Sequence, residues 1–411
     1  MSDRRRVVVT GLGAVTPYGV GVEPFWHGCL SGCSGVTELR LSDLGPRAAG
    51  QVDFALEAWL TKLEARRLSR FCQFALVAAR EALADASVDP ARLEPERIGV
   101  ALGTGSGALV QETQQALATR STKGWAALDP LSLIRALPDM AAANVGLALG
   151  VRGPILTCVA SCSSATVALA QALDLIRNDR ADMVIAGGAE AWLTPVGIAS
   201  FLALRALSTR RCPPREASCP YDKRRDGFVP AEAAGVLVLE SEEHAALRGV
   251  PIRAELAGAA VNSDGFHVVA PRPDGGSAAR CMVEAMRDAG VKPDEVDYIN
   301  AHGTSTQLND AAEAKAIETV WAEEPGRPLL SSTKSLIGHA LGASGAVETV
   351  AVVKTIEEGA VHPGINLVEP DPACQLRHVG PAARQADVRV VLKNSFAFGG
   401  QNACLVVRRY E

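Results

Sequence analysis

Short runs of apolar residues alternate with longer segments of helical character along most of the chain. In the first part of the sequence, the apolar runs predict strands at 7–10, 98–102, 155–159, 183–186 and 236–239. Segments rich in alanine and leucine at 71–84 and 163–177 predict helices between them. Glycines follow the first and fourth runs, at Gly11 and at Gly187-Gly188, and we expect those strands to end there. Buried strands separated by helices are typical of parallel or mixed sheets that helices cover.

The second part of the chain repeats this pattern. Apolar runs predict strands at 296–300, 329–332, 388–392 and 404–407, and a small-residue helix is expected at 342–357. The segments 153–176 and 328–356 each pass from an apolar strand through a polar turn into a helix of small residues, which is a weak internal repeat. The polar segment 208–230 is expected to be a long surface connection.

Composition narrows the class of protein. The chain has 411 residues, of which 48% are hydrophobic and 21% charged, as in ordinary soluble globular proteins. Its net charge of -5 lacks the basic excess of a nucleic-acid binder. The longest uncharged stretch, 153–173, contains proline and several polar residues and is a poor membrane span. The apolar run after three arginines near the N-terminus lacks an A-x-A cleavage site and is better explained as a first strand.

Cysteine usage points to a reducing compartment. The chain has 10 cysteines but no CxxC pair, so a structural zinc site is not expected. A chain of this length does not need disulfides to stabilise a core. We expect a cytoplasmic protein with most thiols buried and free.

The segment TCVASCSSA, residues 157–165, carries the sharpest local signal. It places Cys162 where an apolar run passes into a helix, and Cys158 inside the strand. Unpaired N–H groups and the helix dipole at such a site lower a thiol pKa. We therefore expect a thiolate at Cys162 near neutral pH, beside N–H groups that can bind an oxyanion. A lone cysteine at this position is equally compatible with packing, so other residues must decide.

Two histidines have a similar placement. His302 follows an apolar run in AHGTST, and His339 ends SSTKSLIGH after another. Loops at strand ends are the usual location of catalytic groups in α/β proteins. His27, His244, His362 and His378 lack this placement, and we assign them to the surface or to packing; His267 stays ambiguous.

Two glycine-rich segments also follow apolar runs. NSFAFGGQN, residues 394–402, indicates a loop with aromatic side chains and a close backbone approach to a ligand, although a core turn fits as well. Residues 103–108 fit G-x-G-x-x-A, but no acidic residue ends a second strand about 20 positions later. We therefore expect no dinucleotide site. A thiolate nucleophile forms a thioester without an activating cofactor, so no cofactor is expected.

Taken together, these segments resemble the β-ketoacyl-[acyl-carrier-protein] synthases, which are decarboxylating condensing enzymes with the thiolase fold. The resemblance covers nearly the whole chain, from VVVTG at 7–11 to the C-terminus. It includes the segments AGGAE at 186–190, PYD at 220–222 and RDGF at 225–228, together with AHGTST, SSTKSLIGH and NSFAFGG. It implies a layered α-β-α-β-α body of two similar α/β halves, about 1–250 and 251–411.

The resemblance also implies roles for individual residues. Cys162 would be the nucleophile that takes the acyl chain, and His302 and His339 would assist decarboxylation of malonyl-acyl-carrier-protein. Lys334 and Glu348 match an accompanying charged pair. Phe398 matches an aromatic gate, and its N–H would join that of Cys162 in an oxyanion hole. Asp310 and Glu313 match acidic positions that are structural.

Two alternatives differ in class. A non-catalytic chain-length-type partner of a ketosynthase heterodimer lacks the nucleophile, so Cys162 argues against it. A thiolase would use a second cysteine near the C-terminus in place of one histidine, but Cys404 lies in an apolar run. Departures from the family pattern, such as Ala397 between the two phenylalanines and Gln307 after AHGTST, leave fatty-acid and type II polyketide or polyene pathways open.

The expected partners are an acyl carrier protein and a second subunit. Carrier proteins of such systems are acidic, so electrostatic steering to basic residues is expected. The basic residues proposed for docking form two runs: Lys62, Arg66, Arg67 and Arg70, and then Arg205, Arg210 and Arg211. A solvated charged face explains them equally well. The resemblance implies a dimer, formed with an identical copy or with a ketosynthase-like paralogue; no nucleic acid, membrane or metal is expected.

Overall fold

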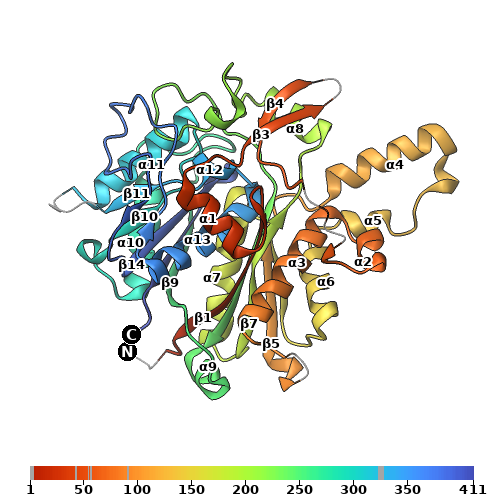
Figure 1. The fold of residues 1–411 in the computed structure, drawn as a ribbon, viewed down its shortest axis with the longest axis horizontal. Helices are drawn as coiled ribbons and strands as arrows, with labels where there is room; N and C mark the ends of the chain where they lie inside the picture. The colour runs from red at the N-terminus through yellow and green to blue at the C-terminus, as the bar shows by residue number, and fades with distance from the viewer. Residues whose placement is uncertain (1–3, 42–43, 54, 56–57, 90–91, 323–327) are drawn as a thin grey trace.

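The computed structural model describes residues 4–41, 44–53, 55, 58–89, 92–322 and 328–411. Within these ranges, one 11-stranded sheet extends through the molecule (Figure 1). Its strands from the first half are β1 (Val7–Thr16), β2 (Gly19–Val20), β5 (Ile98–Gly103), β6 (Ile155–Cys158), β7 (Met183–Glu190) and β8 (Ala233–Ser241). Those from the second half are β9 (Ala254–Ser263), β10 (Tyr298–Asn300), β11 (Leu329–Ser331), β14 (Val390–Ala397) and β15 (Gln401–Arg408).

The strand order shows how the two halves meet. It is β11-β10-β14-β15-β9-β1-β8-β7-β5-β6, with β2 paired to β1 beside this path. β1 and β9 join the halves through an antiparallel pairing that places Val8 opposite Glu255 and Val9 opposite Ala254. β10 is parallel to both β11 and β14, and β5 is parallel to both β6 and β7. The mixed sheet covered by helices confirms the predicted α/β class.

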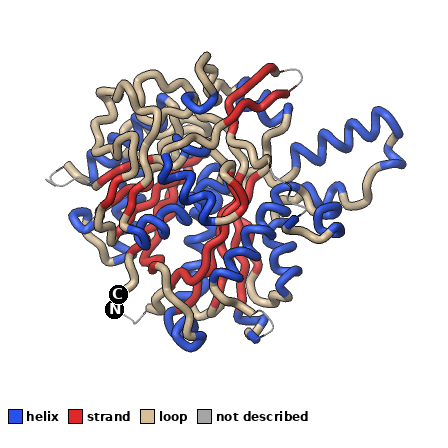
Figure 2. The backbone as a smooth tube through the Cα atoms, viewed as in Figure 1, coloured by secondary structure: helices blue, strands red, loops and turns tan. Residues whose placement is uncertain are grey.

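Helices form three layers around and between these strands (Figures 1 and 2). α3 (Arg70–Asp85) and α6 (Met140–Leu149) pack outside the strands of the first half, and α10 (Gly276–Ala289) and α11 (Gln307–Val320) lie outside those of the second. Between the two runs of strands lie α7 (Ser164–Arg177) and α13 (Ser344–Glu358), which contact strands of both halves. The core therefore extends through both halves, and α7 and α13 are buried at its centre.

The remaining elements are short or peripheral. They are α1 (Val22–Ser31), β3 (Thr37–Leu41), β4 (Gly45–Ala49), α2 (Lys62–Arg67), α4 (Leu109–Lys123), α5 (Ser132–Ala136), α8 (Pro195–Ala203), α9 (Glu242–Arg248), α12 (Lys334–Ile337), β12 (Ala360–Val361) and β13 (Arg384–Gln385). In Figure 1, α4 projects away from the body. Among the described residues, no helix combines the length and the apolar character needed to cross a membrane.

Close contacts at glycine hold the layers together. A Cβ atom on Gly13 of β1 would lie 1.9 Å from the Ala78 carbonyl oxygen of α3. A Cβ atom on Gly345 of α13 would lie 2.2 Å from the hydroxyl oxygen of Thr166 in α7. Because no side chain fits at either position, glycine permits this close packing. The second contact brings together the two central helices that lead to the candidate site.

Three local expectations were wrong. β1 continues through Gly11 to Thr16, and β7 continues through Gly187 to Glu190. A Cβ atom on Gly187 would lie 2.1 Å from the Gly235 carbonyl oxygen, so this glycine serves close strand approach. The segment 208–230 is only partly a surface connection, because residues 218–222 and 227–230 are buried.

Candidate active site

Cys162 lies in the tight turn between β6 and α7, as predicted. The preceding residue, Ser161, has a φ of 50°, a conformation that costs roughly 1 kcal/mol or more for a residue with a side chain. The hydroxyl of Ser164 accepts the N–H of Ala160 at 2.8 Å and fixes the turn. A short 3-10 turn, Ser161–Ser163, then leads into α7. Cys162 is 6% exposed, and Cys158 is half-buried in β6.

His302 follows β10 and is held through its backbone. The N–H groups of His302 and Gly303 donate to the two carboxylate oxygens of Glu313 in α11, each at 2.8 Å. Asp310, one turn earlier in α11, accepts the N–H of Thr304 at 3.0 Å and that of Tyr221 at 2.9 Å. Glu313 and Asp310 therefore shape the loop, which fits the structural role that the sequence suggested for them.

His339 follows α12, and its ring lies against the ring of His302. Its N–H donates to the Val229 carbonyl oxygen at 2.7 Å, and its Nδ1 lies 2.9 Å from the Ser344 hydroxyl at the start of α13. The rings of His302 and His339 meet edge to face, with centroids 5.5 Å apart and an angle of 86°. Phe228 packs edge-on against His339 at 5.3 Å.

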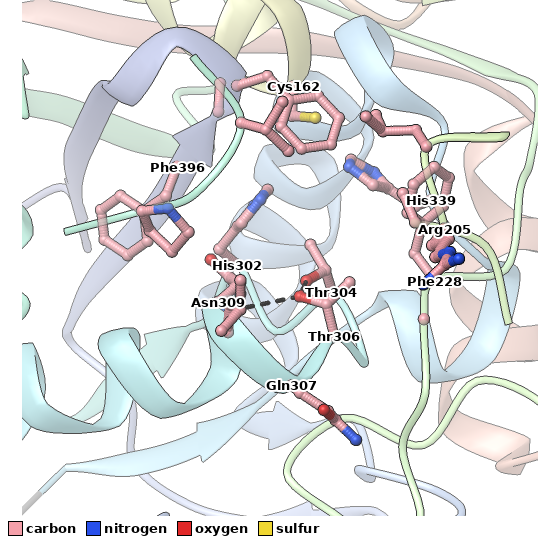
Figure 3. Close-up of a pocket in the computed structure, with 18 of the residues that line it drawn as sticks. Cys162, Arg205, Phe228, His302, Thr304, Thr306, Gln307, Asn309, His339 and Phe396 are labelled. Atoms are coloured by element: carbon pink, nitrogen blue, oxygen red, sulfur yellow. Dashed lines mark hydrogen bonds between the residues drawn. The ribbon is translucent and has the colours of Figure 1, made fainter. Parts of the chain in front are cut away.

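These two rings converge on the thiol. The Cys162 sulfur and one ring nitrogen from each of His302 and His339 all lie within 4.8 Å of one another. The three residues line one cavity of about 380 Å³ (Figure 3). The three side chains lie 140 and 37 residues apart in the chain, and the fold brings them together as their placement after apolar runs predicted.

Both imidazoles are neutral near pH 7. Burial is the main cause that lowers the pKa of His302 well below 6.5, and Lys334, His339 and Lys393 lower it further. Burial, Lys334 and Lys393 likewise lower the pKa of His339. A neutral imidazole keeps one N–H donor and one acceptor nitrogen, so either ring can donate to or accept from a reacting group.

The expected thiolate at Cys162 is not what the resting site favours. Burial raises the pKa of this thiol to about 12. Lys334 and the N–H groups of Phe398 and Cys162 itself lower it, and Glu190 raises it, but the cost of desolvating a thiolate outweighs the favourable groups. The expectation was wrong because the sequence shows the helix start but not the depth of burial. The resting sulfur is therefore a thiol.

A buried charged cluster lies behind the histidines. Lys334 and Glu348 form an ion pair, and each side chain is 2% exposed. This places together the two residues that the family resemblance paired. A second lysine, Lys393 of β14, lies 2.8 Å from the other oxygen of Glu348 and has no exposed side-chain surface. Sequence analysis missed Lys393, although it directly follows the apolar run 388–392.

Phe398 completes the region around the sulfur. It lies at the turn after β14 and lines the cavity, and its N–H is close enough to the Cys162 sulfur to lower the pKa of the thiol. Its ring stacks on Phe201, with centroids 6.3 Å apart and an angle of 23°. The N–H of Phe398 and that of Cys162 can together bind an oxyanion that forms on a carbon attached to this sulfur.

A cluster of three aromatic side chains, Trp192, Phe201 and Phe228, packs beside Phe398. Trp192 lies 4.9 Å and Phe228 lies 5.4 Å from Phe201, measured between ring centroids. These side chains, with Cys162 and Leu341, belong to one apolar cluster. Sequence analysis did not assign Trp192 and Phe201 to the site, and their chain positions carry no signal that would have done so. Of these three side chains, Phe228 lines the cavity and gives it an apolar surface suited to an acyl chain, while Trp192 and Phe201 pack behind it.

The outer part of the cavity is polar. Thr304, Thr306, Gln307 and Asn309 line it below His302 (Figure 3). The hydroxyls of Thr304 and Thr306 lie 2.9 Å apart, and that of Thr306 accepts the Asn309 N–H at the start of α11. The two threonines belong to AHGTST, and this motif was the signal that could have found them.

The proposed docking residues divide into free and engaged side chains. Lys62, Arg66 and Arg67 are exposed on α2, and Arg211 is exposed as well. Arg205 is exposed and lines the cavity.

Two residues of the basic runs are engaged within the chain. Arg70 pairs with Glu232 at 2.6 Å and lies over the Phe74 ring. Arg210 donates to the Glu216 carbonyl oxygen at 2.8 Å and to the Cys219 sulfur at 3.0 Å. Of the seven basic residues predicted to dock a carrier, Arg70 and Arg210 are therefore occupied by contacts within the chain.

The spacing of the Cys162 sulfur and the two imidazoles would also suit a small metal ion. The ammonium groups of Lys334 and Lys393 act on both imidazoles and oppose a cation there. The described cavity is therefore better suited to developing negative charge.

Comparisons with known proteins agree with this geometry. Residues 4–245 match the family model described as "Beta-ketoacyl synthase, N-terminal domain", and residues 253–368 match "Beta-ketoacyl synthase, C-terminal domain". The chain is 42% identical over 414 residues to the 3-oxoacyl-[acyl-carrier-protein] synthase 2 of Synechocystis sp., covering 100% of this chain and 99% of that protein.

Solved structures show the same architecture. One is a type II polyketide synthase acyl-carrier protein in complex with its ketosynthase bound to the hexaketide. The chain superimposes on it with a TM-score of 0.91 and 38% identity, covering 99% of this chain and 100% of that one. The ishigamide ketosynthase/chain length factor gives a TM-score of 0.91 at 34% identity, with the same coverage.

Proposed function

The chain belongs to the beta-ketoacyl synthase family, and from that premise we propose how its residues carry out the condensation. The reaction joins an acyl thioester to malonyl-acyl-carrier-protein, releases carbon dioxide and gives β-ketoacyl-acyl-carrier-protein. The enzyme is an acyltransferase. The observation that carries the assignment of residues is the approach of the Cys162 sulfur and the two neutral imidazoles to within 4.8 Å of one another in one cavity.

In the first step, Cys162 accepts the acyl group. A bond forms between its sulfur and the acyl carbonyl carbon, and the bond to the carrier sulfur breaks. The N–H groups of Cys162 and Phe398 hold the negative oxygen of the tetrahedral intermediate. Because the resting sulfur is a thiol, its proton must leave as the new bond forms, and His302 and His339 are the nearest bases. The departing carrier thiolate finally takes that proton.

In the second step, the bond between the malonyl carboxylate and its neighbouring carbon breaks. Carbon dioxide leaves, and the bonding electrons form an enolate. N–H groups of His302 and His339 stabilise the enolate oxygen as charge develops there. The enolate carbon then attacks the acyl carbonyl carbon, and the Cys162 sulfur leaves as a thiolate, which takes up a proton from solvent to restore the resting thiol. Decarboxylation supplies the carbanion without a strong base, which matches a site with neutral imidazoles.

The Ser344 hydroxyl can hold His339 in the tautomer that this step needs by donating to Nδ1. When the hydroxyl donates to Nδ1, Nε2 carries the proton. His339 Nε2 is buried and has no hydrogen-bond partner among the described residues. It is therefore available to donate to an enolate oxygen.

The experiment that tests the catalytic assignment is mass spectrometry of the intact protein and its peptides after mixing with acyl-carrier substrate. An acyl adduct on the Cys162 peptide is expected, and Cys162→Ala should abolish it. Cys158→Ala is the matched control, because this half-buried thiol lies in the neighbouring strand. Absence of an adduct on the parent protein would instead support the non-catalytic partner role, which the presence of Cys162 does not favour.

Thiolase chemistry is less compatible with the described site. Cys404 is fully buried in β15, and its thiol lies 3.4 Å from the Asn394 side-chain oxygen. It packs in the apolar cluster of the second half and does not line the cavity. Thiolysis with coenzyme A is therefore expected to be undetectable, and measurable activity would contradict the assignment.

For its partners, we propose an acidic acyl carrier protein that docks on Lys62, Arg66 and Arg67 and reaches the cavity past Arg205. Exposure of the first three side chains and the cavity position of Arg205 support this route. The solved relative that contains an acyl-carrier protein with its ketosynthase supports a protein carrier.

We also propose a dimer formed through the edge strand β6. This strand ends the sheet, and Ile155 in it is 42% exposed. On and around α5, Leu133 and Ile134 are 72% and 47% exposed, and Trp125 after α4 is 58% exposed. Such a group of exposed apolar side chains is typical of an interface. Native mass spectrometry, alone and with a ketosynthase-like paralogue, distinguishes a homodimer from a heterodimer.

Pathway and compartment are proposed together. We assign the enzyme to type II fatty-acid or polyketide synthesis, since relatives in both are similar over the full chain. We place it in the cytoplasm because all ten cysteines are free. Cell fractionation tests the compartment, and product analysis with reconstituted carrier and reductases tests the pathway.

A further inference from the structure

Lys393 has no role in the reaction as derived so far, yet its ammonium group lies deep in the protein. Its side chain has no exposed surface, and it directly follows three apolar residues of β14. Burying an ammonium group costs several kcal/mol unless oppositely charged or polar groups compensate for its lost hydration. An apolar residue would be less costly at this position, so the contacts of Lys393 need an explanation.

Four oxygen atoms surround Lys393 Nζ. They are Glu348 Oε2 at 2.8 Å, the Asn394 carbonyl oxygen at 3.0 Å, Thr166 Oγ1 at 3.2 Å and Ser395 Oγ. The hydroxyls of Thr166 and Ser395 also lie 2.7 Å apart. Lys393 and Ser395 are two positions apart on β14 and therefore face the same side, toward the central helices. The ammonium group thus lies in a complete polar shell.

This shell joins three elements that carry the site. β14 leads directly into Phe398, α7 begins beside Cys162, and α13 carries Glu348. Thr166 is the third residue of α7, one turn from the nucleophile. The Lys393 side chain therefore connects β14, α7 and α13.

The charges of the trio Lys334, Glu348 and Lys393 do not cancel when both lysines are protonated; burial lowers the pKa of Lys393, and Glu348 opposes this effect. Glu348 receives Lys334 on one oxygen and Lys393 on the other, so one carboxylate faces two ammonium groups. The titratable groups that face this centre from the elements packed around it are Cys162, Glu190, Tyr298, His302, Glu313, Lys334, His339, Glu348, His362 and Cys404. Lys393 acts on both histidines and lowers the pKa of each.

We propose that Lys393 is a positioning residue for decarboxylation, which fixes Glu348 and the strand of Phe398 and leaves a net positive charge behind the two imidazoles. This inference deepens the proposed condensation and rests on it. The excess positive charge lies behind the imidazoles, so it favours movement of the negative charge from the malonyl carboxylate to the enolate oxygen that the imidazoles bind. It also keeps both imidazoles unprotonated, so that each retains an acceptor and a donor nitrogen.

The test compares two variants at Lys393 in the full-length protein. Lys393→Gln keeps polar contacts to Thr166 and Ser395 but removes the charge. Acylation of Cys162 should persist, while the rate of carbon dioxide release from malonyl-acyl-carrier-protein should fall at least tenfold. The acid limb of this rate should move to higher pH by about one unit, because a lost positive charge raises the pKa of a neighbouring imidazole.

Chemical rescue supplies the second arm. Lys393→Ala leaves a polar space that methylammonium can enter, and millimolar methylammonium should restore the rate at least fivefold and return the acid limb toward its original position. Lys354→Gln is the matched control: this lysine also contacts α13 residues and is mostly buried, but it pairs with Glu23 and Glu358 away from the cavity. Lys354→Gln should leave the rate of carbon dioxide release and its acid limb at the parent values, with or without methylammonium.

The possible outcomes distinguish failure of the proposed role of Lys393 from failure of the proposed condensation. A rate within twofold of the parent and an unchanged acid limb in Lys393→Gln would overturn the proposal. A rate that falls equally at every pH and is not rescued would also overturn it, since a purely structural role predicts that result. If Lys393→Gln does not fold, Lys393→Ala purified in methylammonium replaces it, and removing the amine must then shift the limb. Failure of the parent protein to acylate Cys162 would instead reject the proposed function itself.

Discussion

His339 Nδ1 lies 2.9 Å from the hydroxyl oxygen of Ser344, the first residue of α13. This contact orients the imidazole and leaves Nε2 to face the reacting groups. Ser344→Ala should therefore slow decarboxylation by roughly tenfold, which corresponds to about 1–2 kcal/mol for one lost hydrogen bond. The KM for malonyl-carrier substrate should change little, because Ser344 does not line the cavity. The measurement is initial carbon dioxide release.

Thr319→Ala is the control for this change. Its hydroxyl donates to the Lys315 carbonyl oxygen on the exposed side of α11, and Thr319 does not line the cavity. Both kinetic constants should match the parent. Equal rates for the Ser344 variant and this control would contradict the orienting role of Ser344.

Burial of His362 should make a contribution to folding stability that is lost as the pH drops below about 6.5. Burial lowers the pKa of His362 to about 4, with Tyr298 and Thr333 as polar neighbours and Glu348 acting in the opposite direction. Between pH 6.5 and about 4 the unfolded chain binds the proton and the folded chain does not. The free energy of unfolding should therefore decrease by about 3 kcal/mol across this window from this group alone.

Urea unfolding at pH 7.5 and pH 5 measures this dependence. His362→Gln should remove the part of the difference that His362 contributes. The remainder combines His302 and His339, whose pKa values burial also lowers, with Glu190 and Asp310, whose pKa values burial raises and which act in the opposite direction. His27→Gln, at a side chain 75% exposed, is the control and should leave the difference unchanged. An identical difference in the His362 variant would show that this group is not the cause.

The turn Phe398–Gly400, which carries the phenylalanine expected to act as a gate, depends on a glycine with a positive φ. Gly399 has a φ of 80°, and its N–H donates to the Val268 carbonyl oxygen at 2.8 Å. Alanine there should cost about 1–2 kcal/mol and displace the neighbouring Phe398 N–H from the Cys162 sulfur. Gly399→Ala should therefore slow acylation of Cys162 by about tenfold in rapid-quench experiments.

Ala397→Gly provides the matched comparison in the same turn. Ala397 replaces the glycine that the family resemblance implies, and its backbone is extended with a φ of -125° and a ψ of 159°, a conformation that any residue adopts. Acylation should stay within about twofold of the parent, because no positive φ is involved. If both variants acylate equally fast, the conformation of this turn does not control the first step.

Much of this fold could be predicted because buried strands form continuous apolar runs. Cys162, His302 and His339 could be found for a related reason, since each follows such a run where strand ends gather. The ends of β1 and β7 were wrong because Gly11 and Gly187 serve close packing and do not terminate strands. The division near residue 250 stays a prediction, which the grouping of strands by halves supports.

Depth within the fold was the property that sequence patterns did not reveal. It raises the pKa of Cys162 to about 12 despite the helix start, and it turns Lys393 from an ordinary strand residue into part of the charged cluster. Trp192 and Phe201 come to lie behind the cavity residue Phe398 through tertiary packing alone. Local sequence therefore identified the reacting groups better than the surroundings that set their protonation.

Charge reversal on α2 should weaken recognition of the carrier protein. Arg66 and Arg67 are exposed in the last turn of α2, whose start is fixed independently by a Thr61–Glu64 capping box. The double change Arg66→Glu and Arg67→Glu should raise the KM for carrier-bound substrate about tenfold at low salt, since four units of charge change against an acidic partner. The effect should shrink near physiological ionic strength, where screening acts over about 8 Å.

Arg70 distinguishes docking from stability on the same basic run. Its guanidinium pairs with Glu232 at 2.6 Å, and the carboxylate is almost fully buried with 6% of its side chain exposed. Arg70→Gln leaves that carboxylate without its charge partner, so it should lower the melting temperature while the KM of the folded enzyme stays near the parent value. A double variant on α2 with an unchanged KM at low salt would refute docking there, and a raised KM for Arg70→Gln without loss of stability would return Arg70 to the docking surface.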